Sequence, residues 1–176
     1  MSPDGSSGGA PGSPRVIAGD RVGSFVLTRL LGMGGMGAVF EATQDAPRRT
    51  VAVKVLGGTA QDAASAARRL RQEAELQGRL SHPGIAQVFD AGVAETTRGP
   101  VAYYAMEYIP GARSLTRYAD EKGLSLRERA ALLARVCEAA EHGHRAGVVH
   151  RDLTPLNILV DGEGRMAAAS AGFAGL

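Results

Sequence analysis

The sequence predicts an α+β fold in two unequal parts, and three observations lead to this prediction. Short runs of β-branched and aromatic residues dominate the first half of the chain, and long helical periodicity appears only in the second half. Glycine-rich or polar stretches separate the short runs. With 176 residues, of which 44% are hydrophobic, the chain is long enough for one domain with its own core and short for two.

The first part of the chain predicts five antiparallel strands and one helix. Residues 1–14 are rich in Gly, Ser and Pro and predict a disordered tail, with order beginning near Val22. Residues 25–31, 38–43 and 50–56 then predict a three-strand meander. A helical pattern over 62–80 ends at Ser81-His82-Pro83, and two further strands are expected in 85–93 and 101–109.

The second part predicts one long helix. The segment "LSLRERAALLARVCEAAEHGHRAG" begins with a capping box of Ser125 and Glu128 and can end at Gly147. Its apolar residues recur at alternating four- and three-residue steps, which predicts a buried stripe formed by Leu126, Ala130, Leu133, Cys137, Ala140 and His144. Few other helices are expected here, so we also expect an apolar patch to be exposed around Leu133.

Composition excludes several classes of protein. The net charge is only +2, and no basic run with interleaved aromatic residues appears, so we expect no nucleic-acid partner. The single cysteine, Cys137, excludes an internal disulfide and fits a reducing compartment. We find neither a secretion signal nor an apolar run near the roughly 20 residues that cross a bilayer. A cytoplasmic protein is therefore expected.

The stretch "LLGMGGMGAVF" contains a G-x-G-x-x-G pattern at Gly32, Gly34 and Gly37. Backbone N–H groups can approach phosphate oxygens closely where no Cβ intervenes. An ordinary hairpin turn is the alternative in a chain with 24 glycines. A dinucleotide site is disfavoured, because that site needs a helix directly after the glycines and residues 38–40 predict a strand.

Lys54 stands in a β pattern, "VAVK", although 18 of the 20 basic residues in this chain are arginines. Helical spacing places Glu73 on the inward face of the 62–80 helix with Leu70 and Leu80. An inward carboxylate is costly unless a cation pairs with it, which predicts a Lys54–Glu73 ion pair. The alternative is a partly exposed Glu73 neutralised by nearby arginines.

The loop "HRDLTPLN" carries the most specific pattern, with Asp152 five residues before Asn157. Together with "LGMGGMGAVF", "VAVK", Glu73 followed by "LSHPGIAQVFD", and "MEYIPG", it makes the chain resemble the bacterial eukaryotic-like serine/threonine protein kinases from about residue 20 to 174. The resemblance implies a nucleotide-binding N-lobe and hinge at 20–109, after a tail at 1–19. It also implies a partial C-lobe with the catalytic loop at 110–176.

The resemblance also implies ATP, Mg²⁺ and a protein substrate. Asp152 would orient the substrate hydroxyl and accept its proton, Lys54 held by Glu73 would touch the α- and β-phosphates, and Asn157 would bind the metal. Leu31, Val39 and Ala52 would enclose the adenine beside Met106, and the backbone of Glu107 and Ile109 would bind its edge. The phosphates would lie under the turn formed by Gly32, Met33, Gly34, Gly35, Met36 and Gly37.

Two positions depart from the family pattern. Thr154 stands where the family usually has a lysine that reaches the transferred phosphate, and a neutral hydroxyl predicts a slower reaction. Counting from Asn157, the metal-binding Asp-Phe-Gly falls on Ser170-Ala171-Gly172. Because Mg²⁺ prefers carboxylate oxygens, Ser170 is a poor ligand.

The composition changes after Arg165, and alanines replace an expected buried strand although alanine favours helices. We hypothesise that residues 166–176 are not native kinase sequence and arise from a frameshift, a premature stop or a fragmentary gene. The kinase-like fold would then end just after the Asp-Phe-Gly position, and little or no turnover is expected. The alternatives to an impaired kinase are a pseudokinase-like module that binds ATP or a protein, and a non-functional fragment.

Overall fold

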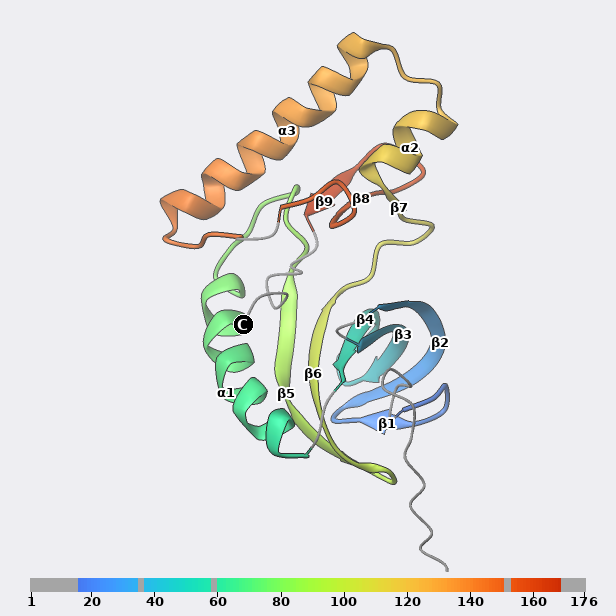
Figure 1. Cartoon of the computed structure of the whole chain (residues 1–176), viewed down its shortest axis with the longest axis vertical. Coiled ribbons are helices and arrows are strands. Elements are labelled where there is room, and N and C mark those ends of the chain that lie inside the picture. Colours follow the sequence, from blue (N-terminus) through green and yellow to red (C-terminus); the bar gives the residue numbers. More distant parts are fainter. Residues whose placement is uncertain (1–15, 35–36, 58–59, 151–152, 169–176) are drawn as a thin grey trace, which may run out of the picture.

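The computed structural model describes residues 16–34, 37–57, 60–150 and 153–168, and its elements form two groups (Figure 1). A six-stranded sheet with helix α1 lies at one end of the molecule. A three-stranded sheet with α2 and α3 lies at the other end. This arrangement is the predicted α+β fold. The exact domain boundaries at residues 20 and 110 remain a prediction, and the expected tail at 1–14 lies outside the described residues.

The larger sheet is antiparallel throughout and has the strand order β1-β2-β3-β4-β6-β5. Its strands are β1 (Arg21–Val22), β2 (Phe25–Gly34), β3 (Gly37–Asp45), β4 (Arg48–Leu56), β5 (Val88–Thr96) and β6 (Gly99–Glu107). The five predicted strands are confirmed, and the short β1 adds a sixth. The strands β2 and β3 run further into the glycine segment than the sequence predicted, because main-chain pairing continues from Leu30 opposite Phe40 to Gly34 opposite Gly37.

Gly37 is required by the fold at the start of β3. Its φ of +135° is a conformation that residues with a side chain rarely adopt. A Cβ at this position would also meet the Val55 carbonyl oxygen at 2.0 Å. This one glycine of the pattern therefore has a structural explanation in the close approach of β3 and β4.

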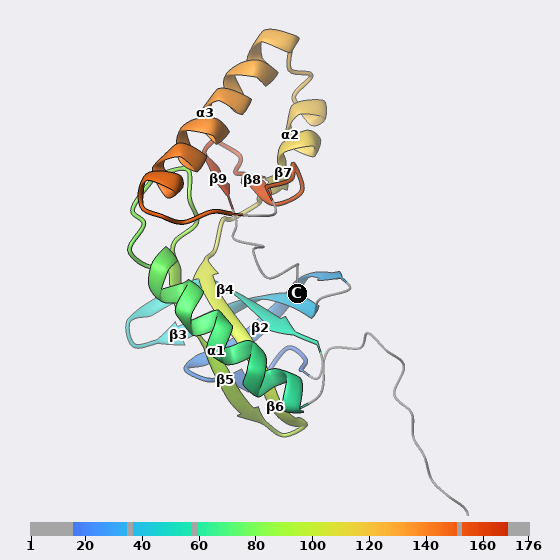
Figure 2. The ribbon, with the colours of Figure 1, turned by 60° about the vertical axis from the view of Figure 1, so that its left-hand side comes forward.

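Helix α1 (Ala60–Gln77) packs against β5 and β6 (Figure 2). Its described buried side chains, Ala63, Leu70 and Gln77, are spaced seven residues apart and form one face, and Glu75 is exposed on another. The predicted inward face of this helix is thus confirmed for Leu70 and Gln77. The helix ends at Gln77 rather than at residue 80, and Leu80 is buried in the turn that follows.

The two faces of the larger sheet form two cores. One core contains Phe25, Phe40 and Tyr103 with the three alternating valines of β4, and the other lies between the sheet and α1. Because side chains alternate along a strand, Ala52 and Lys54 lie on the opposite face from Val51, Val53 and Val55. This confirms the prediction that the valines of the "VAVK" strand face one side of the sheet and that Ala52 and Lys54 face the other.

The second group contains β7 (Arg113–Ser114), α2 (Leu115–Glu121), α3 (Leu126–Arg145), β8 (Ile158–Val160) and β9 (Met166–Ala168). Its three strands pair in the order β7-β8-β9, a sheet that the sequence prediction of a helical part missed. Met166, Ala167 and Ala168 were expected to suit a helix, and that expectation was wrong. They form a buried strand, because pairing with β8 and burial outweigh the weak intrinsic preference of alanine.

Helix α3 begins and ends as predicted. Ser125 and Glu128 form both bonds of the capping box, and Gly147 follows the helix with a φ of +78°. The predicted buried stripe was wrong, since the buried residues are Leu132, Val136, Ala139 and Gly143. Leu126 is 84% exposed and Leu133 is 56% exposed, which confirms the expected apolar patch around Leu133.

Among the described residues, the main chain joins the two groups in two places, here called crossings. In the first, Ala168 of β9 exchanges backbone hydrogen bonds with the segment after α1, accepting from Ala86 at 3.1 Å and donating to Gly84 at 2.8 Å. The second is the chain from the end of β6 to β7. Within the described ranges, no helix has both the length and the apolar character needed to span a bilayer.

Candidate functional site

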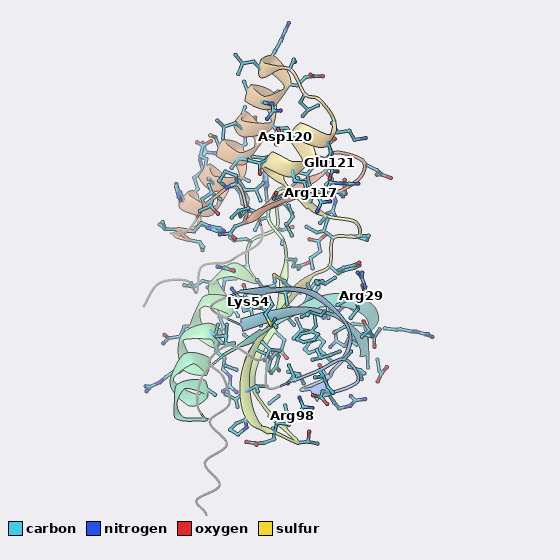
Figure 3. The ribbon with its side chains drawn as sticks, turned by 45° about the vertical axis from the view of Figure 1, so that its right-hand side comes forward. Arg29, Lys54, Arg98, Arg117, Asp120 and Glu121 are labelled. Atoms are coloured by element: carbon cyan, nitrogen blue, oxygen red, sulfur yellow. The ribbon has the colours of Figure 1, made fainter. Side chains whose placement is uncertain are left out.

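A cleft of about 570 Å³ lies between the two groups of elements. Figure 3 labels Arg29 and Lys54, which both lie on the side of the larger sheet that faces the second group. The cleft is lined by Arg29, Leu31, Gly32, Val39, Ala52, Lys54, Ala86, Met106, Glu107, Tyr108, Ile109, Gly111, Ala112, Leu156, Asn157 and Leu159. Nine of these residues are among those predicted from the sequence.

Strand register brings the predicted apolar residues together. Ala52 on β4 pairs directly with Met106 on β6, and both are buried. Val39 on β3 pairs with Lys54 on β4. Lys54 lies two residues after Ala52 and therefore on the same face of that strand. The sheet therefore forms one wall, apolar at Ala52 and cationic at Lys54.

The glycine segment contributes Gly32 directly to the cleft. A Cβ built at Gly32 or Gly34 would meet no atom within 4 Å, so the space around this backbone is open to a ligand. Met33, Gly34 and Gly37 do not line the cleft, and Gly35 and Met36 lie outside the described residues.

Lys54 is half-buried on the wall of the cleft. The backbone of Glu73 belongs to α1, but its side chain is not among the described ones, so the Lys54–Glu73 pair remains a prediction. On the same helix face, four residues further, the Gln77 amide oxygen accepts a 2.5 Å hydrogen bond from the Tyr104 hydroxyl. Tyr104 in turn pairs with Lys54 across β4 and β6.

The opposite wall comes from the second crossing and the loop before β8. Ile109 and Ala112 line the cleft from this crossing. Leu156 and Asn157 line it from the loop, and Leu159 lines it from β8. The Asn157 N–H donates to the Thr154 carbonyl at 3.0 Å, which closes the turn on which Asn157 lines the cleft. Asp152 and Ser170 lie outside the described residues, so the structure does not place them.

Sequence reasoning missed a polar cluster at the rim of the cleft. The Arg29 guanidinium donates to the Glu41 carboxylate at 2.6 Å and to the Tyr108 hydroxyl at 3.2 Å. Burial, followed by the hydrogen bond to Glu41, raises the pKa of Tyr108, so the phenol stays neutral well above pH 7. The pairing of β2 with β3 shifts register between Leu30 and Gly32, so strand alternation gave no signal for this cluster.

The cleft has the size and lining of a small-molecule site. Its volume lies in the usual range of roughly 300–1,000 Å³ for small-molecule sites, and its apolar walls carry few polar groups. Lys54 and the open backbone at Gly32 supply partners for phosphate oxygens. Mg²⁺ often takes only one or two protein oxygens besides phosphates and water, so the Asn157 amide suits it. Elsewhere in the described part of the chain, no cluster of three or more acidic, His or Cys residues could hold a metal ion.

The family model described as "Protein kinase domain" matches residues 25–175, and the chain therefore belongs to the protein kinase domain family. The matched residues include both walls of the cleft. The match extends through residue 175, and the hypothesis of a foreign sequence after Arg165 stays a prediction.

Individual relatives are bacterial serine/threonine kinases. The chain is 36% identical to serine/threonine-protein kinase PknB of Mycolicibacterium smegmatis over 136 residues, covering 77% of this chain and 22% of that protein. It is 34% identical to PknB of Mycobacterium tuberculosis over 150 residues, covering 85% and 24%. The chain thus matches about a quarter of the length of these curated relatives.

Solved structures give the same assignment. The kinase domain of Mycobacterium tuberculosis PknI is similar with a TM-score of 0.74 and 29% sequence identity, covering 90% of this chain and 62% of that structure. A double mutant of the same domain gives a TM-score of 0.76 with 28% identity, covering 91% and 63%. The predicted fold class is confirmed at this level.

Proposed function

We propose that this chain is the nucleotide-binding and catalytic-loop part of a serine/threonine protein kinase, with the cleft as its ATP site. The observation that supports this best is the convergence of nine predicted residues from separate segments on one cleft. In this proposal Leu31, Val39 and Ala52 enclose the adenine beside Met106. The backbone of Glu107 and Ile109 binds its edge.

Lys54 and the backbone of the glycine segment would hold the phosphates. A lysine supplies a compact positive charge that interacts with phosphate without needing a fixed fork geometry. Glu73 on the inward face of α1 would hold the ammonium group in place. The Asn157 amide would supply the protein ligand to Mg²⁺, which when bound neutralises phosphate charge.

Asp152 would act on the protein substrate. Its carboxylate orients a serine or threonine hydroxyl and accepts the proton as the hydroxyl oxygen bonds to the γ-phosphorus. The bond between the γ-phosphorus and the oxygen that bridges it to the β-phosphate breaks, and ADP leaves. Thr154 can donate a hydrogen bond but cannot offset the developing negative charge, and Ser170 lacks a carboxylate. We therefore expect low turnover.

The two lysines of the chain provide a matched test of nucleotide binding. Lys54→Met is expected to weaken ATP binding about tenfold or more, which corresponds to about 1.4 kcal/mol. Lys122→Met, at an exposed position after α2, is expected to leave the dissociation constant unchanged. Isothermal titration with ATP and Mg²⁺ measures both. Equal affinities in the two variants would contradict the proposed site.

A second candidate function is nucleotide binding without transfer. The serine at position 170, where the family has its metal-binding Asp, favours this alternative. Transfer of labelled phosphate from ATP to a mixed protein substrate, lost in Asp152→Asn, would support the kinase. ATP binding that is indifferent to Mg²⁺, with no transfer in either protein, would support the binding module.

A further inference from the structure

A side-chain bond joins two walls of the cleft that the sheet itself does not pair. Two strands, β3 and β4, separate β2 from β6 in the larger sheet. The Arg29 Nη2 on β2 nevertheless donates to the hydroxyl of Tyr108, the residue that directly follows β6, at 3.2 Å. Both residues line the cleft. Among the side-chain bonds of the described residues, this one alone connects β2 or β3 with residues 108–112.

The strand around Arg29 is irregular, which affects where its side chain points. The pairing of β2 with β3 shifts register both before Arg29 and after Leu30. Such irregularities change the direction of the side chains beside them. Arg29 stands opposite Glu41 on β3, and the Glu41 carboxylate accepts from the same Nη2 at 2.6 Å. This ion pair restricts the guanidinium to positions within reach of Tyr108.

Tyr108 is supported on its own side of the cleft. Its ring packs against the core between the sheet and α1. The preceding residue, Glu107, accepts from Arg165 of the β8–β9 turn at 2.8 Å and from the Gln87 N–H at 3.3 Å. The bond to Tyr108 therefore ties Arg29 to a part of the chain that is itself held by several contacts.

We propose that Arg29 is a positioning residue for the nucleotide: its bond to Tyr108 holds β2 against the cleft and slows release of the ligand. Leu31 and Gly32, which line the cleft, lie two and three residues after Arg29 on the same strand. Movement of β2 away from Tyr108 would therefore carry both of them away from the ligand. This inference rests on the proposed function, because it takes ATP as the ligand.

The expected effect is modest, because the contact is open to solvent. The Arg29 side chain is 62% exposed, and exposed ionic contacts are weak. Loss of the bond is expected to raise the dissociation rate of the nucleotide about threefold. The association rate is expected to stay within about twofold of the parent, since changes in affinity among variants of one site act mostly on dissociation.

Two variants remove this bond in different ways. Arg29→Met removes the donor, and Tyr108→Phe removes the hydroxyl but keeps the ring. Each is expected to release a fluorescent ATP analogue about threefold faster when excess ATP displaces it in a stopped-flow experiment. Because both variants lose the same bond, the double variant is expected to release the analogue no faster than either single variant.

Arg21→Met provides the matched control. It breaks an exposed arginine–carboxylate pair with Asp45 on the same sheet, and neither residue lines the cleft. Its dissociation rate is expected to equal that of the parent, and a rise like that of Arg29→Met would overturn the inference.

Two further results would also overturn it. The first is a parental dissociation rate in both single variants, with a lower melting temperature alone, because the bond would then have only a structural role. The second is a double variant whose rate increase is the product of the two single increases. Arg29 and Tyr108 would then act on the ligand separately rather than through their shared bond.

The same variants separate the two levels of proposal. If the parent binds ATP and Lys54→Met weakens binding, while Arg29→Met and Tyr108→Phe release the analogue at the parental rate, the inference fails and the proposed function stands. If the parent does not bind ATP at all, the proposed function fails and the inference fails with it.

Discussion

At the scale of single residues, the hydrogen bond between Tyr104 and Gln77 fixes how α1 lies on the sheet. Tyr104 is fully buried, and Gln77 is 6% exposed. Apart from the tyrosines, Gln77 is the one polar side chain that is buried among the described residues. A buried polar pair specifies a single arrangement, because sliding or rotating the helix would leave both groups without their bond.

Tyr104→Phe is expected to lower the free energy of unfolding by about 1 to 3 kcal/mol, because the Gln77 amide oxygen loses its buried donor. Urea denaturation measures the change. Tyr108→Phe loses a hydroxyl at the rim of the cleft and is expected to cost clearly less. Combining Gln77→Leu with Tyr104→Phe should recover part of the loss, and a double variant less stable than either single one would contradict this account.

Asp161 makes the turn before β9 sensitive to acid. Burial alone would raise the pKa of this carboxyl, but hydrogen bonds from Arg165 and Glu163 outweigh it and lower the pKa below 3.8. A depressed folded-state pKa means that the stabilisation is present above the unfolded value and is lost as pH falls through the folded value. Stability should therefore decrease below about pH 4.

Asp161→Asn is expected to weaken that acid dependence, because an amide has no proton to gain in this range. Melting temperatures between pH 2.5 and 7 compare the two proteins, with Asp120→Asn, at a largely exposed ion pair, as the control. An unchanged slope in Asp161→Asn would show that other carboxyls account for the acid sensitivity.

At the scale of elements, α3 has two apolar faces and only one of them is buried. Val136 and Ala139 pack with β8 and β9, and Leu132 is also buried, whereas the neighbouring Leu133 points to solvent. Periodicity alone could not choose between these faces, since leucines and alanines stand on both. The strands of the smaller sheet make the choice, and they were not predicted.

The adjacent leucines test this assignment directly. Leu132→Ala is expected to lower the free energy of unfolding by about 2 kcal/mol or more, because a buried side chain leaves a cavity. Leu133→Ala is expected to change it by no more than about 0.5 kcal/mol. Equal losses in urea denaturation would mean that both faces of α3 are covered in solution.

The exposed face of α3 has a consequence for solubility. Apolar residues that stand together on a surface promote association, and Leu126 and Leu133 are both largely exposed.

At the scale of the whole molecule, the cleft requires both groups of elements. Its lining combines Val39 and Ala52 from the larger sheet with Asn157 and Leu159 from the second group. A nucleotide in this site would contact segments that are distant in the sequence, so its binding should stabilise them together.

Hydrogen exchange followed by mass spectrometry checks this expectation. Addition of ATP and Mg²⁺ should slow exchange in residues 29–34, 104–112 and 156–159 at the same time. Residues 126–135 at the start of α3 line no part of the cleft and serve as the internal control. Protection confined to one segment would contradict a shared site.

Much of this site could be predicted from the sequence because its chemistry is local in the chain. Lys54 was singled out by its strand and by the arginine preference of the rest of the sequence, and the cleft contains it. The Arg29–Tyr108 contact and the Glu107–Arg165 pair could not be predicted, because each joins segments at least 58 residues apart. No periodicity records which distant side chains will meet.

The sequence by itself determined the fold class, the five main strands, the capped α3 helix and nine of the residues that line the cleft. These features depend on strand alternation, helix capping and motif spacing, all of which act over a few residues. Only the tertiary structure decided which face of α3 is buried, that Met166–Ala168 forms a strand, and that Arg165 pairs with Glu107. These outcomes depend on which surfaces come together, and packing there outweighs the weak local preferences of alanine and leucine.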